Sequence, residues 1–143
     1  TTLEQCPKLD ILIVPGGWGT RELVTNQKIL DWLVQQAGQV KTLASVCTGS
    51  MVLAQAGLLN GLDATTHWRS LARMREQFPK VNVITDKHFV MQGNICTSAG
   101  ISAGVDMSLK LVAHYVGEPV ARATAKHMEY PYPESDTRRI QGI

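Results

Sequence analysis

The sequence has little charge, few aromatic residues and no long hydrophobic run, and each shortage excludes a class of protein. Of the 143 residues, 18% are charged and 6% are aromatic, while 44% are hydrophobic. That balance excludes a disordered chain and a coiled coil and predicts one soluble globular domain. Lys and Arg total 14 against 12 Asp and Glu, so the net charge of +2 indicates neither a nucleic acid nor an acidic lipid surface as partner.

Cysteine is also scarce, since the sequence has only Cys6, Cys47 and Cys96 at wide spacing. A secreted disulfide scaffold has an even number of cysteines and a metal site has close pairs, so we expect neither disulfides nor a metal. The longest apolar run, residues 9–15, is too short to cross a bilayer, and residues 1–6 lack the features of a signal peptide. We therefore expect a cytoplasmic protein with no membrane partner.

The order of hydrophobic patterns predicts alternating strands and helices. The aliphatic run at residues 9–14, which stops at Pro15, predicts a central parallel strand buried on both faces. Further strands are expected at residues 41–46, 64–66, 81–84, 89–92 and 95–97, and helices at residues 26–36, 51–56, 69–77, 101–116 and 118–128. This alternation predicts an α/β fold with a mostly parallel sheet, as one domain over residues 1–143, with an antiparallel excursion at residues 81–92.

The two ends of the chain carry separate expectations. A central strand lies within ten residues of the start, so we expect an open edge or core face unless another segment or subunit covers it. The tail, residues 130–143, contains prolines and mixed charge, so it is expected to wrap a surface or to be partly loose. The pair Arg138-Arg139 is too short for a nucleic-acid patch and is expected to be solvated.

Residues 44–50, Ala-Ser-Val-Cys-Thr-Gly-Ser, carry the strongest chemical signal. They place Cys47 between an apolar strand and a helix, which is the pattern of a nucleophile elbow. The helix start favours thiolate over thiol, so Cys47 is the candidate nucleophile; the alternative is a buried cysteine that acts as a small hydrophobe. Gly16 and Gly17 are expected at the same edge of the sheet, where they and the N–H of Thr48 form a candidate oxyanion hole.

Five motifs together resemble the ThiJ/PfpI superfamily, a group similar to class I glutamine amidotransferases. They are Val14-Pro15-Gly16-Gly17, Cys47-Thr48-Gly49, Ala56-Gly57-Leu58-Leu59-Asn60-Gly61, Ala64-Thr65-Thr66-His67-Trp68 and Thr97-Ser98-Ala99-Gly100. The elbow followed by Thr-Thr-His-Trp is most similar to the isocyanide hydratase branch and to sensor domains of AraC-type regulators.

The resemblance implies a flavodoxin-like three-layer sandwich, here without its first strand and helix, and a homodimer. It also implies that Cys47 is the nucleophile, that Thr48 is its neighbour in the oxyanion region and that Gly17 is a backbone donor. Protease-like members have a histidine where Thr48 stands, which disfavours a Cys-His peptidase. In the hydratase branch an acidic residue from the first strand and helix contacts the cysteine, and that segment would precede Thr1. The catalytic acid is therefore unassigned.

Aromatic residues supply the other site candidates. His67 lies inside a family motif, and two interpretations stay open: it orients substrate or acts as a general base, or it is hydrogen-bonded beside Trp68. Trp68 and Trp18 are expected at the mouth of the pocket. The remaining histidines are expected to be solvated or to cap helices, and Cys96 to lie in the core; these histidines are His88, His114 and His127.

The resemblance implies an enzyme without a cofactor that acts on a small-molecule electrophile. Cys47 adds to an isocyanide, an acid protonates the adduct, and water releases an N-substituted formamide. Three alternatives stay open: a glyoxalase-like enzyme, a redox-sensing stress protein oxidised at Cys47, and the ligand-sensing domain of an AraC-type regulator. The last requires a helix-turn-helix domain after the tail.

Overall fold

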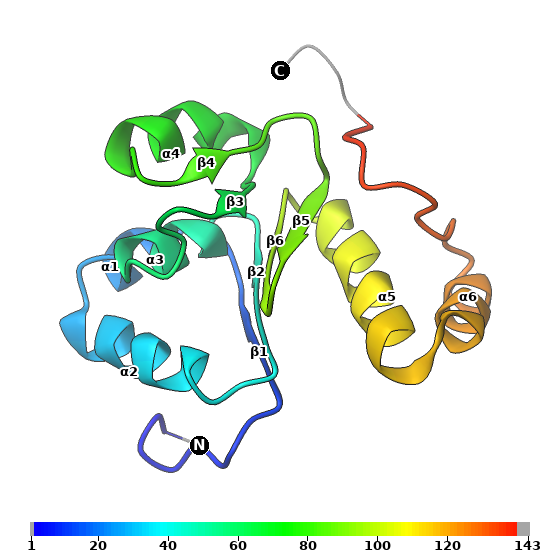
Figure 1. Cartoon of the computed structure of the whole chain (residues 1–143), viewed down its shortest axis with the longest axis horizontal. Coiled ribbons are helices and arrows are strands. Elements are labelled where there is room, and N and C mark those ends of the chain that lie inside the picture. The colour runs from blue at the N-terminus through cyan, green and yellow to red at the C-terminus, as the bar shows by residue number, and fades with distance from the viewer. Residues whose placement is uncertain (1, 140–143) are drawn as a thin grey trace.

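Strands in a mostly parallel sheet form the centre of the structure, a computed structural model that describes residues 2–139 (Figure 1). The main sheet has the strand order β1 (Ile11–Val14), β2 (Thr42–Val46), β6 (Ile95–Ser98) and β5 (Phe89–Gln92). β1, β2 and β6 run parallel, and β5 runs antiparallel to β6. β3 (Asp63–Ala64) and β4 (Asn82–Val83) pair in a separate small sheet.

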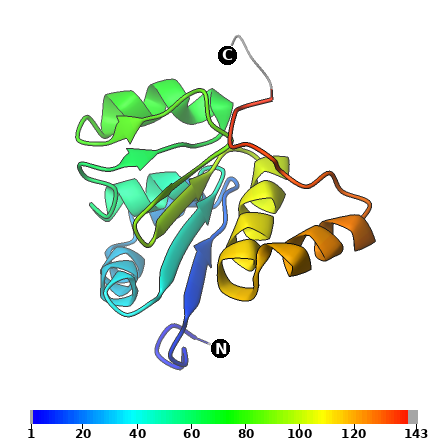
Figure 2. The ribbon, with the colours of Figure 1, turned by 45° about the vertical axis from the view of Figure 1, so that its right-hand side comes forward.

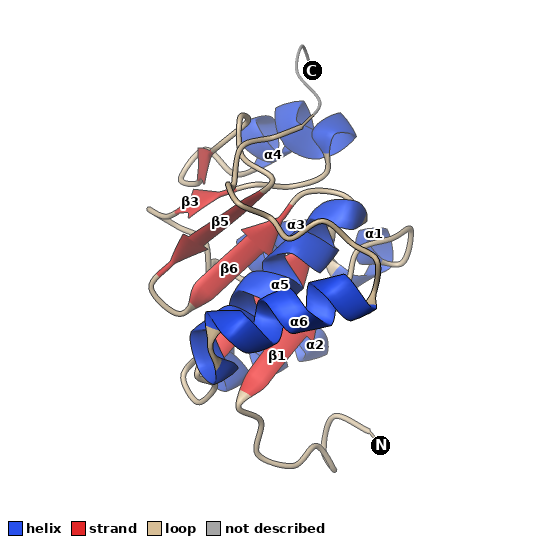
Figure 3. Cartoon of the chain, turned by 90° about the vertical axis from the view of Figure 1, so that its right-hand side faces the viewer, coloured by secondary structure: helices blue, strands red, loops and turns tan. Residues whose placement is uncertain are grey.

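Helices cover both faces of the main sheet, as Figures 2 and 3 show. One face carries α1 (Thr20–Leu23), α2 (Gln27–Ala37) and α3 (Gly49–Gln55). The other carries α5 (Ser102–Val116), and α6 (Glu118–His127) packs on α5. A 3-10 turn, η1 (Trp68–Ser70), leads into α4 (Leu71–Gln77), which lies beside β3 and β4. The predicted three-layer α/β architecture is confirmed.

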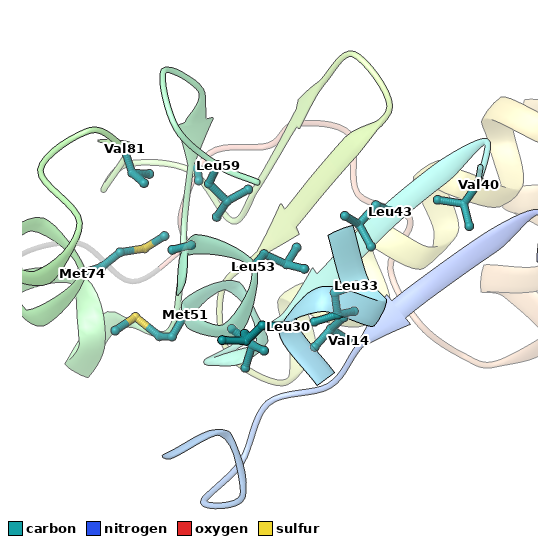
Figure 4. Close-up of a cluster of buried hydrophobic side chains, with 13 residues drawn as sticks. Val14, Leu30, Leu33, Val40, Leu43, Met51, Leu53, Leu59, Met74 and Val81 are labelled. Atoms are coloured by element: carbon teal, nitrogen blue, oxygen red, sulfur yellow. The ribbon is translucent and has the colours of Figure 1, made fainter. Parts of the chain in front are cut away.

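The two faces of β2 supply two separate cores. Leu43 packs with the residues under α2 and α3, a cluster that includes Leu33 and Leu53 (Figure 4). The next residue, Ala44, packs on the opposite face with Met107 of α5. Both strand residues have no exposed surface. Because successive side chains of a strand point to opposite faces, β2 is the central strand that joins the layers.

The prediction that residues 9–14 form a central strand is wrong for the described residues, because β1 pairs with β2 alone and lies at the edge of the sheet. Ile11 and Ile13 are 37% and 44% exposed, whereas Val14 is buried. Aliphatic composition indicates a strand but does not report how many neighbours it has. The open face agrees with the expectation of an uncovered core face.

The segment 81–92 differs in part from its prediction. Residues 89–92 form β5, which is antiparallel to β6 as expected, but residues 82 and 83 pair parallel with β3. The difference arises because a two-residue strand has no sequence pattern that specifies its partner. Within residues 2–139, no helix is both long and apolar enough to cross a membrane.

Candidate active site

Cys47 occupies a sharp turn between β2 and α3, where the sequence predicts it. Its φ of 57° lies in the left-handed region, which a side chain other than glycine rarely adopts. Its N–H faces the carbonyl oxygens of Ser98 at 3.1 Å and Ala99 at 3.2 Å. Its own carbonyl accepts hydrogen bonds from the hydroxyls of Ser50 and Thr66, both at 3.0 Å. These contacts from β6, α3 and the segment after β3 hold the strained turn in place.

Two glycines allow β1 to approach the elbow closely. A Cβ on Gly16 would lie 2.7 Å from the Cβ of Cys47, and a Cβ on Gly49 would overlap the carbonyl oxygen of Val14. In both cases the nearest atoms are backbone atoms or the Cβ of Cys47 rather than the far end of a flexible side chain. Gly16 therefore acts here through the absence of a side chain, and its predicted place beside Cys47 is found in the structure.

Replacing Gly49 with alanine is expected to lower the free energy of unfolding by about 2–4 kcal/mol, because β1 and α3 must move apart to admit the methyl group. Urea denaturation followed by circular dichroism measures this loss. Gly19→Ala is the matched control, since its added Cβ meets nothing within 4 Å. Gly19 has a φ of −59°, which alanine tolerates, so no loss is expected there. Equal stability of the two variants would contradict the close-approach argument.

The Thr48 hydroxyl is the centre of a hydrogen-bond cluster next to the elbow. It accepts the N–H of Gly17 at 3.0 Å and faces the Thr20 hydroxyl at 3.1 Å, and Thr20 in turn donates to the Gly17 carbonyl at 2.8 Å. The Gly17 N–H is therefore engaged, while the Thr48 N–H donates to no backbone carbonyl within residues 2–139. Of the predicted oxyanion donors, the amides of Gly16 and Thr48 thus donate to no backbone carbonyl within residues 2–139, and their role toward a ligand stays a prediction.

His67 lies directly before η1, and its imidazole packs against Gly100. Its Nδ1 accepts the N–H of Arg69 at 3.3 Å, which places the ring proton on Nε2. A Cβ on Gly100 would overlap the imidazole, so the absence of a side chain at Gly100 creates the ring's place. Burial, together with the charges of Arg69 and Arg138, lowers the pKa of His67 below its usual value near 6.5. At neutral pH the ring is therefore neutral and offers an Nε2–H donor.

Two cavities meet at His67. The first, of about 300 Å³, is lined by His67, Trp68, the start of α5 and residues of the tail, and we call it the tail-side cavity. The second, of about 330 Å³, is lined by His67, Thr48, Gly17 and Trp18, and we call it the elbow-side cavity. The two tryptophans line different cavities, and each has an arginine against its ring. The structure thus brings the six predicted site residues together. Four of them line the cavities, namely Gly17, Thr48, His67 and Trp68. Cys47 lies on the turn next to Thr48, and Gly16 packs against that turn.

The remaining thiols do not resemble Cys47. Cys96 is 2% exposed in β6, and burial raises the pKa of its thiol to about 11. This confirms the prediction that Cys96 belongs to the core, where it packs with Ala44 and Met107. Cys6 is half-buried near the start of the chain, far along the sequence from the elbow. Cys47 is therefore the thiol whose position suits nucleophilic chemistry.

The prediction that His88 is solvated or caps a helix is wrong. His88 is 8% exposed, and its Nδ1 lies 3.0 Å from Oδ2 of Asp106, which is itself 1% exposed. The N–H of Arg139 donates to His88 Nε2 at 2.8 Å, so Nδ1 carries the ring proton and donates it to the carboxylate. Both ring nitrogens are engaged. His88 and Asp106 therefore form a structural pair rather than a free acid–base pair.

The prediction that Arg138-Arg139 is solvated is wrong for Arg138, whereas the side chain of Arg139 is 46% exposed. Arg139 pairs with Oδ1 of Asp106 at 2.7 Å, and Tyr130 donates to the same oxygen at 3.0 Å. Arg138 itself is 7% exposed. Lys87 and Thr137 form a β-bridge that holds the tail against the segment before β5. The expectation that the tail wraps a surface is thus confirmed for residues 130–139, while residues 140–143 lie outside the described part.

Sequence reasoning missed several residues that build this site, including Thr20, Thr66, Asp106 and Arg138. Asp106 carried one usable signal, since an acidic residue in the middle of an otherwise apolar helix face indicates a buried partner. Thr20 and Thr66 carried none, because their hydroxyls act only through contacts between distant segments.

Cys47 lies at a strand-to-helix turn at the carboxyl edge of a parallel sheet. This geometry is that of the class of α/β proteins with a nucleophile elbow. Residues 1–114 match the model of the DJ-1/PfpI family, so the chain belongs to that family.

Named relatives and a solved structure refine this assignment. The isonitrile hydratase of Pseudomonas putida is 42% identical over 139 residues, which are 96% of this chain and 59% of the relative. The transcriptional regulator GbdR of Pseudomonas aeruginosa is 39% identical over 96% of this chain and 37% of the regulator. The crystal structure of a ThiJ/PfpI family protein from Pseudomonas syringae superposes with a TM-score of 0.81 at 32% identity, covering 94% of this chain and 55% of that one. The chain thus spans less than two thirds of the length of these relatives.

Proposed function

We propose that this chain carries the nucleophile of a cysteine-dependent lyase that hydrates isocyanides to N-substituted formamides. The observation that carries the proposal is the strained Cys47 elbow, with the Thr48 amide left free beside it and His67 between two cavities. The isonitrile hydratase of Pseudomonas putida, at 42% identity, supports this chemistry over other additions to a thiolate.

In the proposed reaction the Cys47 thiolate attacks the terminal carbon of the isocyanide and forms a C–S bond. A proton delivered to the same carbon gives a thioimidate, R–N=CH–S–Cys47. Water then adds to that carbon, the C–S bond breaks, and the thiolate leaves as the nitrogen gains its proton. The sum is R–NC plus water giving R–NH–CHO, so the protein supplies a nucleophile and proton transfers without an external oxidant or reductant.

The neighbouring groups have separate roles in this scheme. The Thr48 N–H donates to the charge that develops on the adduct, since an unpaired amide at a helix start stabilises an anion. The neutral His67 presents Nε2–H and orients the isocyanide or its attacking water. No carboxylate lines either cavity within residues 2–139, so the acid that protonates carbon stays unassigned.

The test is the hydration of an aryl isocyanide by the chain, followed by ultraviolet absorbance, with the formamide identified by nuclear magnetic resonance. Turnover above the rate in buffer, abolished by stoichiometric alkylation of Cys47 with iodoacetamide, is expected. Mass spectrometry identifies the alkylated residue. Absence of the formamide with fully reduced, folded protein would contradict the proposal.

His67→Asn is expected to lower the turnover rate by about 10–100-fold, because a positioned proton donor typically contributes at least that much. The stability of the fold should change little, since His67 is only partly buried and Asn can still accept the Arg69 N–H. Gly100→Ala is a second variant that leaves His67 in place but displaces its ring. Both variants should lose turnover together. A rate unchanged in both would remove His67 from the mechanism.

A ligand-sensing domain is the second candidate, favoured by the match to GbdR over 96% of this chain. Such a domain would bind a small molecule at the same cavities without turning it over. Binding that survives alkylation of Cys47, in the absence of any formamide, would support sensing over catalysis.

A further inference from the structure

Arg138 is a buried cation that forms no ion pair with any residue the structure describes. It is 7% exposed, and its Nη2 donates to Thr65 Oγ1 at 3.0 Å and to the Thr66 carbonyl at 3.3 Å, both uncharged acceptors. Its Nε is buried and has no hydrogen-bond acceptor. Within residues 2–139, no carboxylate forms a salt bridge with it. A buried charge is strongly unfavourable unless it is paired, so this position requires an anion.

The acidic residues near Arg138 do not supply that charge. Asp106 is already shared between His88, Arg139 and Tyr130. Asp86 contributes its backbone carbonyl, which accepts the Arg138 N–H at 2.6 Å, while its side chain is exposed. Neither carboxylate therefore forms an ion pair with Arg138, although the charge of Asp86 acts on it from a distance.

The tail-side cavity, which Arg138 lines, also contains the amino end of α5. Ser102 and Ala103 line it, and the N-cap residue Ile101 makes no side-chain cap. α5 has 15 residues, so its dipole favours an anion at this point, although Ala103 and Gly104 already donate their N–H groups to the carbonyls of Gly100 and Ile101. Two independent features thus border the same cavity: an arginine with no ion pair among residues 2–139, and a helix start without a side-chain cap.

The rest of the tail-side cavity combines apolar residues with Arg139, whose guanidinium is already paired with Asp106. Trp68, Ala99 and Ile101 line it, and no acidic residue does. The elbow-side cavity continues the same charge pattern, because Arg21, Arg69 and Arg73 line it, again without an acidic residue. Together the two cavities suit a molecule with an apolar body and a negatively charged end.

We propose that the tail-side cavity binds the carboxylate group of the substrate, with Arg138 and the start of α5 as its anchors. A carboxylate supplies the ion pair that the Arg138 guanidinium lacks within residues 2–139. Thr66 connects the anchor to the nucleophile, since its carbonyl accepts from Arg138 and its hydroxyl donates to the Cys47 carbonyl.

The substrate class that follows is an isocyanide that carries a carboxylate on an apolar body. This deepens the proposed function and rests on it for the reacting end, whereas the carboxylate site can be tested without any turnover.

The experiment uses benzoate and its neutral analogue benzamide as probes, measured by isothermal titration calorimetry at low chloride. Benzoate is expected to bind at least about tenfold more tightly than benzamide, the effect of one charge-assisted hydrogen-bond pair. Equal affinities, or no benzoate binding up to about 10 mM, would overturn the carboxylate site.

Ser102→Asp separates binding from folding. Ser102 is exposed at the first position of α5, where an added carboxylate favours the helix but occupies the anion site. The variant is expected to keep or raise the melting temperature while weakening benzoate binding by at least about tenfold. Ser102→Asn, of nearly the same size as aspartate but without its charge, should bind benzoate more tightly than Ser102→Asp. Equal binding by the two variants contradicts the proposal.

Arg138→Met tests the anchor directly, with Arg75→Met as the control because Arg75 is exposed on α4 and lines neither cavity. Benzoate binding should be lost in the first variant and kept in the second. If Arg138→Met does not fold, the Ser102 pair decides the question. The two proposals also fail separately: benzoate binding without isocyanide turnover leaves the anion site standing, whereas turnover without benzoate binding removes the site and keeps the function.

Discussion

Cys47→Gly is expected to abolish turnover and, at the same time, to give a more stable protein than Cys47→Ala. The loss of the nucleophile should lower the rate by at least about 10⁴-fold in both variants. The stability difference arises from the φ of 57° at Cys47, which glycine adopts freely and alanine does not. Glycine relieves the backbone strain but also raises the entropy of the unfolded chain. The net effect is a free energy of unfolding about 1 kcal/mol higher for Cys47→Gly than for Cys47→Ala.

The pair of variants can be compared by urea denaturation and by the isocyanide assay. Cys96→Ala provides the control for loss of a thiol, because Cys96 is buried in the core and is expected to keep full turnover. If Cys47→Gly is no more stable than Cys47→Ala, the elbow is not strained in solution. If either variant hydrates the isocyanide at the original rate, Cys47 is not the nucleophile. A strained residue at the reacting position indicates that this site is maintained at the expense of fold stability.

The sequence was informative where local pattern determines structure. The elbow could be predicted because an apolar strand, a cysteine and a glycine-containing helix start follow one another within seven residues, and the backbone geometry of such a turn is local. The same holds for α2, whose N-cap Asn26 accepts the Ile29 N–H and whose apolar spacing marks the buried face. The contacts that define such elements join residues that lie close together in the sequence, so the local pattern predicts them.

Features that depend on contacts between distant segments could not be predicted in this way. Arg138 and Thr65 are 73 positions apart, and no periodicity relates them. Charge in a proline-containing tail ordinarily indicates a solvated segment, so burial of Arg138 contradicts the usual pattern. The edge position of β1 was missed for a related reason, since pairing with a neighbour is a property of the assembled sheet.

Asp106→Ala is expected to lower the free energy of unfolding by about 2–3 kcal/mol, the largest loss we expect from a single polar side chain. Asp106 is 1% exposed and accepts from His88, Tyr130 and Arg139. Its removal leaves the His88 and Tyr130 donors without their acceptor, while Arg139 is half-exposed and regains water. Asp106→Asn keeps an acceptor oxygen and should cost about 1 kcal/mol. Urea denaturation measures both losses.

Asp10→Ala is the matched control, because Asp10 pairs with Lys41 at 2.8 Å on the exposed surface and its removal should leave the urea midpoint unchanged. A midpoint in Asp106→Ala equal to that of the control would mean that the tail docks without the carboxylate.

The consequence of the Asp106 change extends beyond stability. Arg139, which Asp106 holds, is adjacent to Arg138, so release of the tail withdraws the guanidinium from the cavity beside His67. Asp106→Ala should therefore weaken benzoate binding even under conditions where the protein remains folded. Asp106→Asn should retain more of the binding, in proportion to the stability it keeps. If stability and benzoate binding decline together, the buried carboxylate of Asp106 holds the tail in place. The docked tail is then required for binding the charged ligand.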